Sequence, residues 1–314
     1  MTNNPKPLEG VFCPVLTPFD DQLNPDITLF VEHCHRVLAE GCHGLAVFGT
    51  TGEANSLSVK ERMLLLDALI DSGVDGSVIA PGTGCAALPD SVRLTQHALE
   101  VGCSGVLMLP PFYYKDVTDD GLFQAFVEII ERVGDPRLKI YLYHIPPVSG
   151  VPLELALVER LADAYPECVV GLKDSSGNWP YTEALLKARP GFGAFSGSEI
   201  FLHNNLLAGG VGTITASANV NAPAIRSAYD GFRGKDAETL QSAITRRRQI
   251  IQAQPMIPSL KAVVAAVTGE NGWRRVRPPL EPISLAASND LIKFLSCFLL
   301  SSTMHFDICL KNNS

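Results

Sequence analysis

The chain has 314 residues, 46% of them hydrophobic, a formal net charge of -8 and a pI near 5.4. This length and apolar content suffice to bury one large core, and single barrels commonly run to about 250 residues. The acidic balance argues against nucleic acid or an anionic membrane as a partner, because both require a concentrated Lys/Arg surface.

The eight cysteines are scattered, with no CxxC pair and no signal peptide, which predicts reduced thiols and a cytoplasmic protein. The sequence contains no run of about 18 uncharged apolar residues, which is the pattern of a membrane-spanning helix. The most apolar segment, 291–310, contains Lys293, His305 and Asp307, so we expect a packed or frayed helix there rather than a span.

Short aliphatic runs alternate with amphipathic stretches along the chain, the pattern of a parallel sheet built from βα units. Stretches of helical period follow the runs, as at 27–39 and 59–70. Ser58 is expected to cap the second of these helices, and Asp90 or Ser91 a third. The eight runs span residues 11–16, 44–48, 78–81, 105–109, 139–143, 169–172, 193–195 and 212–215.

Three further helical segments, 222–229, 237–252 and 259–267, follow the eighth run. We therefore predict a (β/α)8 TIM barrel over residues 8–220 and a C-terminal helical extension over 221–314, with an atypically apolar tail after residue 285. An open doubly wound α/β sheet is the alternative. It is disfavoured because no GxGxxG loop follows the first run.

In such a barrel, the reacting side chains come from the C-terminal ends of the strands and the loops after them. Lys173 closes the sixth run, within VVGLKDSS, where desolvation favours the free amine over the ammonium. A free amine attacks carbonyl carbons. The alternative is a lysine that reaches out of the barrel mouth or pairs with Asp174.

Two other strand ends carry groups suited to the same chemistry. Tyr143 closes the fifth run and is expected beside Lys173, where a phenol can transfer protons; ordinary packing is its alternative. The turn GTTGE at 49–53 offers glycines, hydroxyls and N–H groups that suit a carboxylate. Its alternative is a plain βα turn in which Thr51 or Glu53 caps the next helix.

Four motifs lie in order at strand ends: GTTGE at 49–53, PPFYY at 110–114, YxxPxxxG at 143–150 and GLKDSSG at 171–177. With them the chain resembles the dihydrodipicolinate synthase / N-acetylneuraminate lyase family of class I pyruvate aldolases and synthases, over residues 8–282. The resemblance implies a lyase in which Lys173 forms a Schiff base with pyruvate or a related 2-oxo acid. It implies no cofactor and no metal, and a homo-oligomer, either dimer or tetramer.

By the same resemblance, Tyr143 is the proton shuttle, and Thr50 and Thr51 bind the substrate carboxylate. Family members also borrow a tyrosine from a neighbouring subunit, and Tyr113 or Tyr114 would fill that position. The loop is one residue longer than in the synthases, so both remain candidates. Further substrate contacts are expected from Gly197, Ser198 and the backbone carbonyl of Ile214.

One position departs from the family pattern. Where the synthases have an arginine that binds the carboxylate of the aldehyde substrate, this chain has Val148, which cannot form that ion pair. We therefore expect an aldolase or dehydratase acting on a 2-keto-3-deoxy sugar acid, with 4-hydroxy-tetrahydrodipicolinate synthase as the alternative. His144 is expected either to bind a substrate hydroxyl or to be structural.

Two rival functions lie outside this reading. A metal-dependent aldolase would need several His or carboxylate ligands at strand ends, and the histidines here are isolated. A non-catalytic 2-oxo-acid binding protein would usually have lost Lys173 or Tyr143, and both are present.

Overall fold

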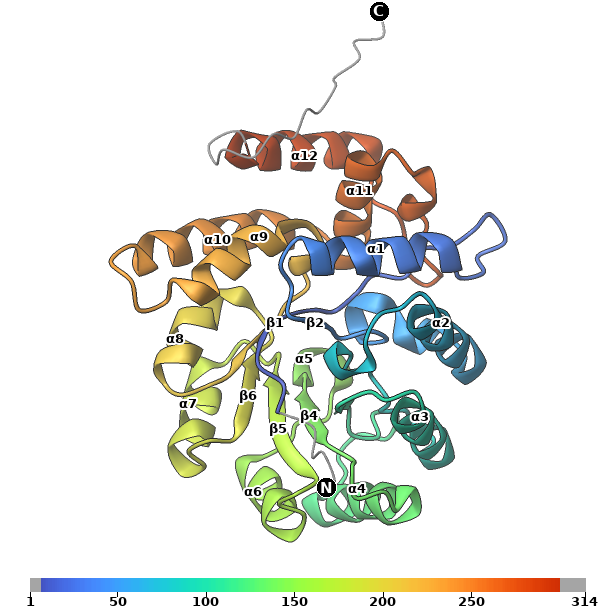
Figure 1. Cartoon of the computed structure of the whole chain (residues 1–314), viewed down its shortest axis with the longest axis vertical. Helices are drawn as coiled ribbons and strands as arrows, with labels where there is room; N and C mark the ends of the chain where they lie inside the picture. Colours follow the sequence, from blue (N-terminus) through green and yellow to red (C-terminus); the bar gives the residue numbers. More distant parts are fainter. Residues whose placement is uncertain (1–6, 300–314) are drawn as a thin grey trace, which may run out of the picture.

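The computed structural model describes residues 7–299 as a central parallel sheet surrounded by helices (Figure 1). The strands run in the order β2-β1-β7-β6-β5-β4-β3, and every neighbouring pair is parallel. They are β1 (Gly10–Cys13), β2 (Gly44–Leu45), β3 (Val106–Met108), β4 (Ile140–His144), β5 (Val169–Asp174), β6 (Gly193–Ser196) and β7 (Gly212–Ile214).

The predicted third strand, at 78–81, was wrong as a strand. Gly76–Val78 forms a 3-10 turn, η3, and the proline at position 81 has no N–H to donate to a ladder. The segment nevertheless bridges both neighbours in parallel, pairing Leu45 with Ile79 and Gly82 with Leu107. It closes the ring between β2 and β3, so the expected barrel is confirmed, with seven strands and one bridging segment.

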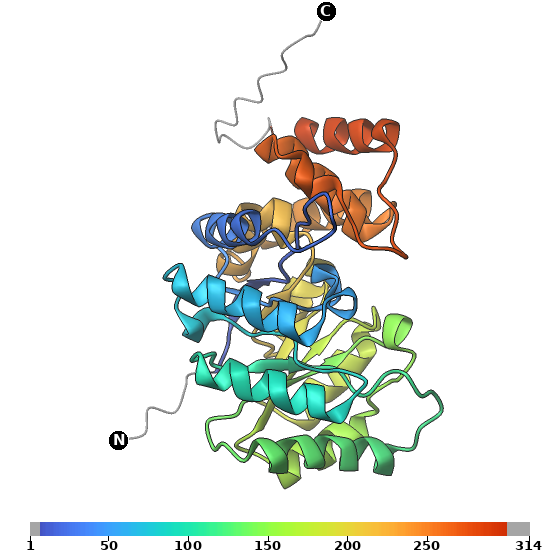
Figure 2. The ribbon, with the colours of Figure 1, turned by 90° about the vertical axis from the view of Figure 1, so that its right-hand side faces the viewer.

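Helices follow the strands and lie outside the barrel, and α2, α3 and α4 are stacked side by side in Figure 2. This placement buries one apolar face of each helix against the strands. The surrounding helices are α1 (Ile27–Ala39), α2 (Val59–Asp71), α3 (Leu88–Glu100), α4 (Asp119–Val133), α6 (Leu155–Ala164), α7 (Trp179–Ala188), α8 (Leu202–Leu207) and α9 (Ala218–Asp230).

The predicted helix starts hold for α2 but not for α3. Ser58 caps α2 and forms a full capping box with Glu61. The cap expected at Asp90 or Ser91 was wrong, because α3 begins at Leu88 with a proline in its first turn, where a missing N–H costs nothing. The hydroxyl of Ser91 instead accepts a hydrogen bond from Cys85 N at 2.9 Å.

The ring of Tyr141 fills the interior of the barrel. Its hydroxyl accepts a hydrogen bond from Leu8 N at 2.7 Å, and its ring contacts Phe195 edge to face at 5.7 Å. Gly171 leaves the room for this ring, since a Cβ there would lie 2.4 Å from Tyr141 Cδ1. Because side chains two apart on a strand share a face, Tyr143 points into the barrel as well, one step closer to its C-terminal end.

The C-terminal extension consists of α10 (Ala237–Gln252), α11 (Met256–Thr268) and α12 (Leu285–Leu299). In Figure 1, α11 and α12 lie at the top and α10 lies below them, beside α9. The three helices of the extension share an apolar cluster that includes Ile251, Leu260, Leu291 and Leu295. The expected helix in the apolar tail is thus confirmed up to residue 299, with Leu291 and Leu295 packed in this cluster, and the rest of that segment lies outside the described residues.

Within residues 7–299 no single helix has both the length and the hydropathy of a membrane span. Helices α10 and α11 reach those limits only as a pair, and the pair is bent by 107°.

Candidate active site

Lys173 and Tyr143 lie side by side at the C-terminal ends of β5 and β4. They are direct partners in the parallel register of these strands, and Lys173 Nζ lies 4.1 Å from the centroid of the Tyr143 ring. Both residues are buried, with 3% and 4% of their surface exposed. The structure therefore brings together the two residues that the sequence predicts as nucleophile and proton shuttle.

The phenol of Tyr143 is surrounded by polar groups. Burial alone would raise its pKa, but the Lys173 ammonium and side-chain hydrogen bonds with Thr50, Lys173 and Ser175 outweigh burial and lower the pKa below its usual value. The distance between Thr50 Oγ1 and Tyr143 Oη is 3.3 Å. A phenol whose pKa is lowered is suited to proton transfer. Ser175 was not singled out from the sequence.

The GTTGE turn follows β2 and lies beside this phenol. Its residues Thr50–Gly52 form a 3-10 turn, η1, in which Thr51 is buried and Thr50 half-buried. Thr17 Oγ1 donates to Gly52 O at 2.8 Å and holds the turn against the loop after β1. A cavity at this end of the barrel is lined by Gly49, Thr50, Gly82, Leu109 and Tyr143, among others. The turn thus lies next to the Tyr143 phenol, and its hydroxyl and N–H groups suit a carboxylate.

The alternative interpretation of the turn expected Thr51 or Glu53 to cap helix α2, and this was wrong. Ser58 takes that role. The Glu53 carboxylate turns inward instead, and accepts hydrogen bonds from Lys261 Nζ and Arg277 N.

The two candidate tyrosines of the rim are among the most exposed apolar side chains described. Tyr113 and Tyr114 have 74% and 75% of their surface exposed, and their rings pack edge to face with centroids 5.4 Å apart. Within its own chain neither ring is buried against the site. A role for either in a neighbouring subunit stays a prediction.

Val148 and His144 lie on either side of the turn from β4 into the short helix α5 (Pro146–Ser149). Val148 is 62% exposed at the surface of this helix. His144 is buried on the face of β4 opposite to Tyr143, where its ring stacks on Tyr181 at 4.2 Å and its Nδ1 accepts from Leu153 N at 3.1 Å. Burial lowers the pKa of His144 although Asp174 raises it. This packing supports the structural interpretation of His144.

The remaining predicted substrate contacts lie at the ends of β6 and β7. Gly197 N donates to Asp174 O at 2.6 Å, and Ile214 ends β7 with 1% of its surface exposed. Ser198 caps the 3-10 turn η4 (Glu199–Phe201). Behind them lies a carboxylate that the sequence analysis missed, that of Glu199, which is fully buried and accepts hydrogen bonds from Thr215, Ser217 and Arg248.

A buried lysine and tyrosine at the mouth of a parallel barrel, beside a turn whose polar groups suit a carboxylate, fit the class of Schiff-base lyases. Residues 7–297 match the model of the dihydrodipicolinate synthetase family, and the chain belongs to this family. It is an enzyme of the lyase class. An uncharacterized DapA-like lyase from Chloroflexus aurantiacus is 34% identical over 88% of this chain and 92% of its own.

Two solved structures resemble the chain over nearly its whole length. The dihydrodipicolinate synthase from Agrobacterium tumefaciens str. C58 is 33% identical, with a TM-score of 0.84 over 93% of this chain and 99% of the other. YagE from E. coli K12, a prophage protein of the same family solved in complex with pyruvate, is 25% identical, with a TM-score of 0.84 over 93% and 99%. These likenesses agree with the fold predicted from the sequence.

Proposed function

We propose that this chain is a class I lyase that binds pyruvate or a 2-keto-3-deoxy sugar acid as an imine on Lys173. The observation that carries the proposal is the buried Lys173–Tyr143 pair, with Nζ 4.1 Å from the ring centroid and Thr50 next to the phenol. The solved complex of YagE with pyruvate supports the choice of ligand.

Imine formation uses Lys173 and Tyr143 in turn. The Lys173 amine adds to C2 of the 2-oxo acid, and a proton moves from nitrogen to the former carbonyl oxygen, giving a carbinolamine. Tyr143 then donates a proton to that hydroxyl as it leaves as water, which leaves the iminium ion. Thr50 and Thr51 hold the substrate carboxylate during these steps.

Bond cleavage follows from the electron demand of the iminium. A base removes the proton of the C4 hydroxyl, the C3–C4 electron pair moves to the iminium nitrogen, and an aldehyde leaves while an enamine remains. Protonation at C3 and addition of water at C2 then release pyruvate and the free lysine. The Tyr143 phenolate, favoured by its lowered pKa, serves as the base.

The alternative is 4-hydroxy-tetrahydrodipicolinate synthase, and the likeness to the Agrobacterium tumefaciens enzyme favours it. Val148 weighs against it, because valine forms no ion pair with the carboxylate of aspartate semialdehyde. We therefore propose a neutral, hydroxylated second substrate.

Replacing Val148 with arginine is expected to shift specificity towards acidic aldehydes. The exposed position screens the charge, so we expect the ratio of kcat/KM for aspartate semialdehyde to that for a neutral aldehyde to rise about ten-fold rather than more. Steady-state kinetics with both aldehydes measure this ratio. Val148→Met, which adds length without charge, is the matched control, and an unchanged ratio in Val148→Arg would remove Val148 from the specificity site.

A turnover assay on the unmodified protein separates the lyase from its rivals. The lyase should convert members of a panel of 2-keto-3-deoxy acids to pyruvate and aldehyde, whereas a binding protein would release no aldehyde. EDTA should leave the rate unchanged, since imine chemistry needs no metal. Among residues 7–299 no group of three or more His, Cys, Asp or Glu side chains is arranged to hold a metal ion.

We also propose a homo-oligomer, a dimer or tetramer, in which Tyr113 or Tyr114 completes the hydroxyl relay of a neighbouring subunit. The exposed pair of rings supports this assignment, because large aromatic side chains are enriched at subunit contacts.

A further inference from the structure

Glu53 ends the turn that carries Thr50 and Thr51, and its side chain has no exposed surface. Its backbone is left-handed, with φ 55° and ψ 34°, a conformation that non-glycine residues adopt only when the surroundings impose it. Its N–H donates to Thr50 O at 3.1 Å. The conformation of Glu53 therefore sets the direction of the backbone directly after Thr50 and Thr51.

The Glu53 carboxylate is held by the C-terminal extension. One oxygen accepts from Nζ of Lys261, which lies on α11 at a sequence separation of 208 residues, and the other accepts from Arg277 N at 2.9 Å. Lys261 Nζ also donates to Arg275 O at 2.7 Å, and the side chain of Lys261 is fully buried. Burial lowers the pKa of Lys261 to about 8, although Glu53 raises it.

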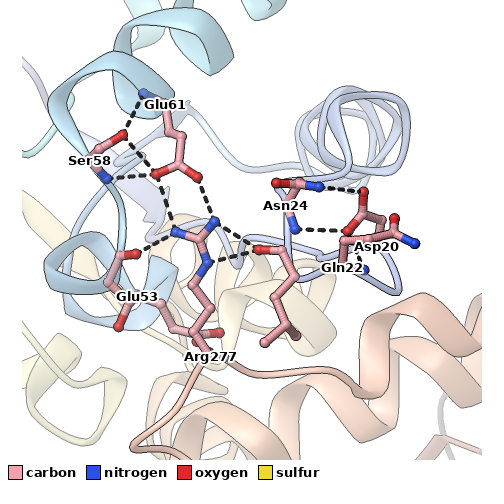
Figure 3. Close-up of polar contacts among 9 residues, drawn as sticks. Asp20, Gln22, Asn24, Glu53, Ser58, Glu61 and Arg277 are labelled. Carbon is pink, nitrogen blue, oxygen red and sulfur yellow. Dashed lines mark hydrogen bonds and ion pairs between the residues drawn. The ribbon is translucent and has the colours of Figure 1, made fainter.

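The side chain of Arg277 binds the loop after β1 and the segment that leads into α2, as Figure 3 shows. Its guanidinium donates to Leu23 O at 2.9 and 2.7 Å, and also to Ser56 O. It forms an ion pair with Glu61, the residue whose carboxylate completes the capping box with Ser58. The segment after α11 thus binds the last residue of the GTTGE turn and the first turn of α2.

A buried ion pair is a poor source of stability, because desolvation offsets the attraction and a well-packed apolar pair is often as stable. Such a pair fixes the relative position of the two side chains, since each group must meet the atoms of the other at hydrogen-bond distance. A carboxylate-binding turn needs this fixed position, because a displacement of about 1 Å is enough to lower activity about 100-fold.

We propose that Lys261 is a positioning residue for 2-oxo-acid binding, and that it acts through Glu53 to hold Thr50 and Thr51 against the substrate carboxylate. This inference rests on the proposed function, because capture of pyruvate by Lys173 is its readout. It gives α11, a helix outside the barrel, a part in the site.

The test compares Lys261→Met, Glu53→Gln and the double variant in the full-length protein. Each is titrated with pyruvate in the presence of borohydride, and the half-saturating concentration is read from the reduced adduct by mass spectrometry. Thermal unfolding is followed in parallel. Lys261→Met should lose stability and raise the half-saturating concentration about ten-fold or more. In the double variant stability should recover, because no unpaired charge stays buried, while the weak binding should persist.

The double variant separates positioning from mere stability. If its half-saturating concentration returned to the wild-type value together with its stability, the pair would be only structural and the inference would be wrong. An unchanged half-saturating concentration in folded Lys261→Met would also overturn it. If Lys261→Met fails to fold, Glu53→Gln and the double variant still decide the question.

Lys139→Met is the matched control. Lys139 is a buried lysine that donates to a backbone carbonyl, Glu167 O, at 2.5 Å, but it lies before β4 at the opposite end of the barrel. This variant should lose stability without a change in pyruvate binding. If wild-type protein trapped no pyruvate, the proposed function would fall and this inference with it. If trapping were normal in wild type and unaffected in the Glu53 and Lys261 variants, only the inference would fall.

Discussion

Replacing Lys173 by alanine should abolish the capture of pyruvate. The primary amine that lies against the Tyr143 ring is then gone, and no imine forms for borohydride to reduce. Turnover should fall by about 10⁴-fold or more, as expected when a covalent nucleophile is removed. Mass spectrometry of the peptide 169–177 measures the capture, and an aldehyde-release assay measures the turnover.

The matched control for this variant is Lys173→Arg. Arginine keeps a cation at the end of β5 beside Tyr143 but does not act as an amine nucleophile, because it stays protonated. It should therefore fail to capture pyruvate as completely as alanine does. Capture that persisted in Lys173→Ala would assign the imine to another lysine and refute the proposed mechanism.

Much of the fold could be predicted because its helices and strands carry regular local signals. The apolar positions of α1 at helical spacing gave both its bounds, and Ser58 with Glu61 marked the start of α2. The aliphatic run at 78–81 looked like its neighbours, but it is pinned by η3 on one side and a proline on the other. The three-dimensional structure is needed to show that two isolated bridges from this segment, one to β2 and one to β3, close the barrel.

The start of α3 shows where a local signal misleads. Asp90 and Ser91 are good capping residues in isolation. Proline, however, is favoured in the first turn of a helix, and the proline at position 89 takes that place in α3. The helix therefore begins two residues before Asp90, at Leu88. Ser91 is left to hold the loop at Cys85.

The candidate site was predictable where it follows strand ends. Lys173 and Tyr143 were expected to be adjacent, and the register confirms that they are. The supports of the site were not predictable, because the partner of Glu53 is Lys261, on a helix 208 residues away in sequence. Periodicity places each residue on an element, but it does not say which distant charge fills the space behind a turn.

Phenylalanine at position 143 should leave capture of pyruvate partly intact and remove most of the turnover. The ring still packs beside Lys173, but the hydroxyl that contacts Thr50 and moves protons is lost. General acid–base catalysis by one side chain contributes about 10²- to 10⁴-fold, so kcat should fall by that amount. Steady-state kinetics and borohydride trapping on the same preparation measure the two effects.

The pH profile gives the sharper test, together with Tyr141→Phe as the control. In the free enzyme Tyr143 must hold its proton to donate it to the carbinolamine hydroxyl. Because its pKa is lowered, wild-type kcat/KM should fall as pH rises through a value below that of free tyrosine. Tyr143→Phe should lack this fall. Tyr141 lies two residues earlier on the same face, with its hydroxyl bonded to Leu8 N. Tyr141→Phe should therefore keep the profile and lose only about 1 kcal/mol of stability. A fall that survived in Tyr143→Phe would assign the proton donor to another group.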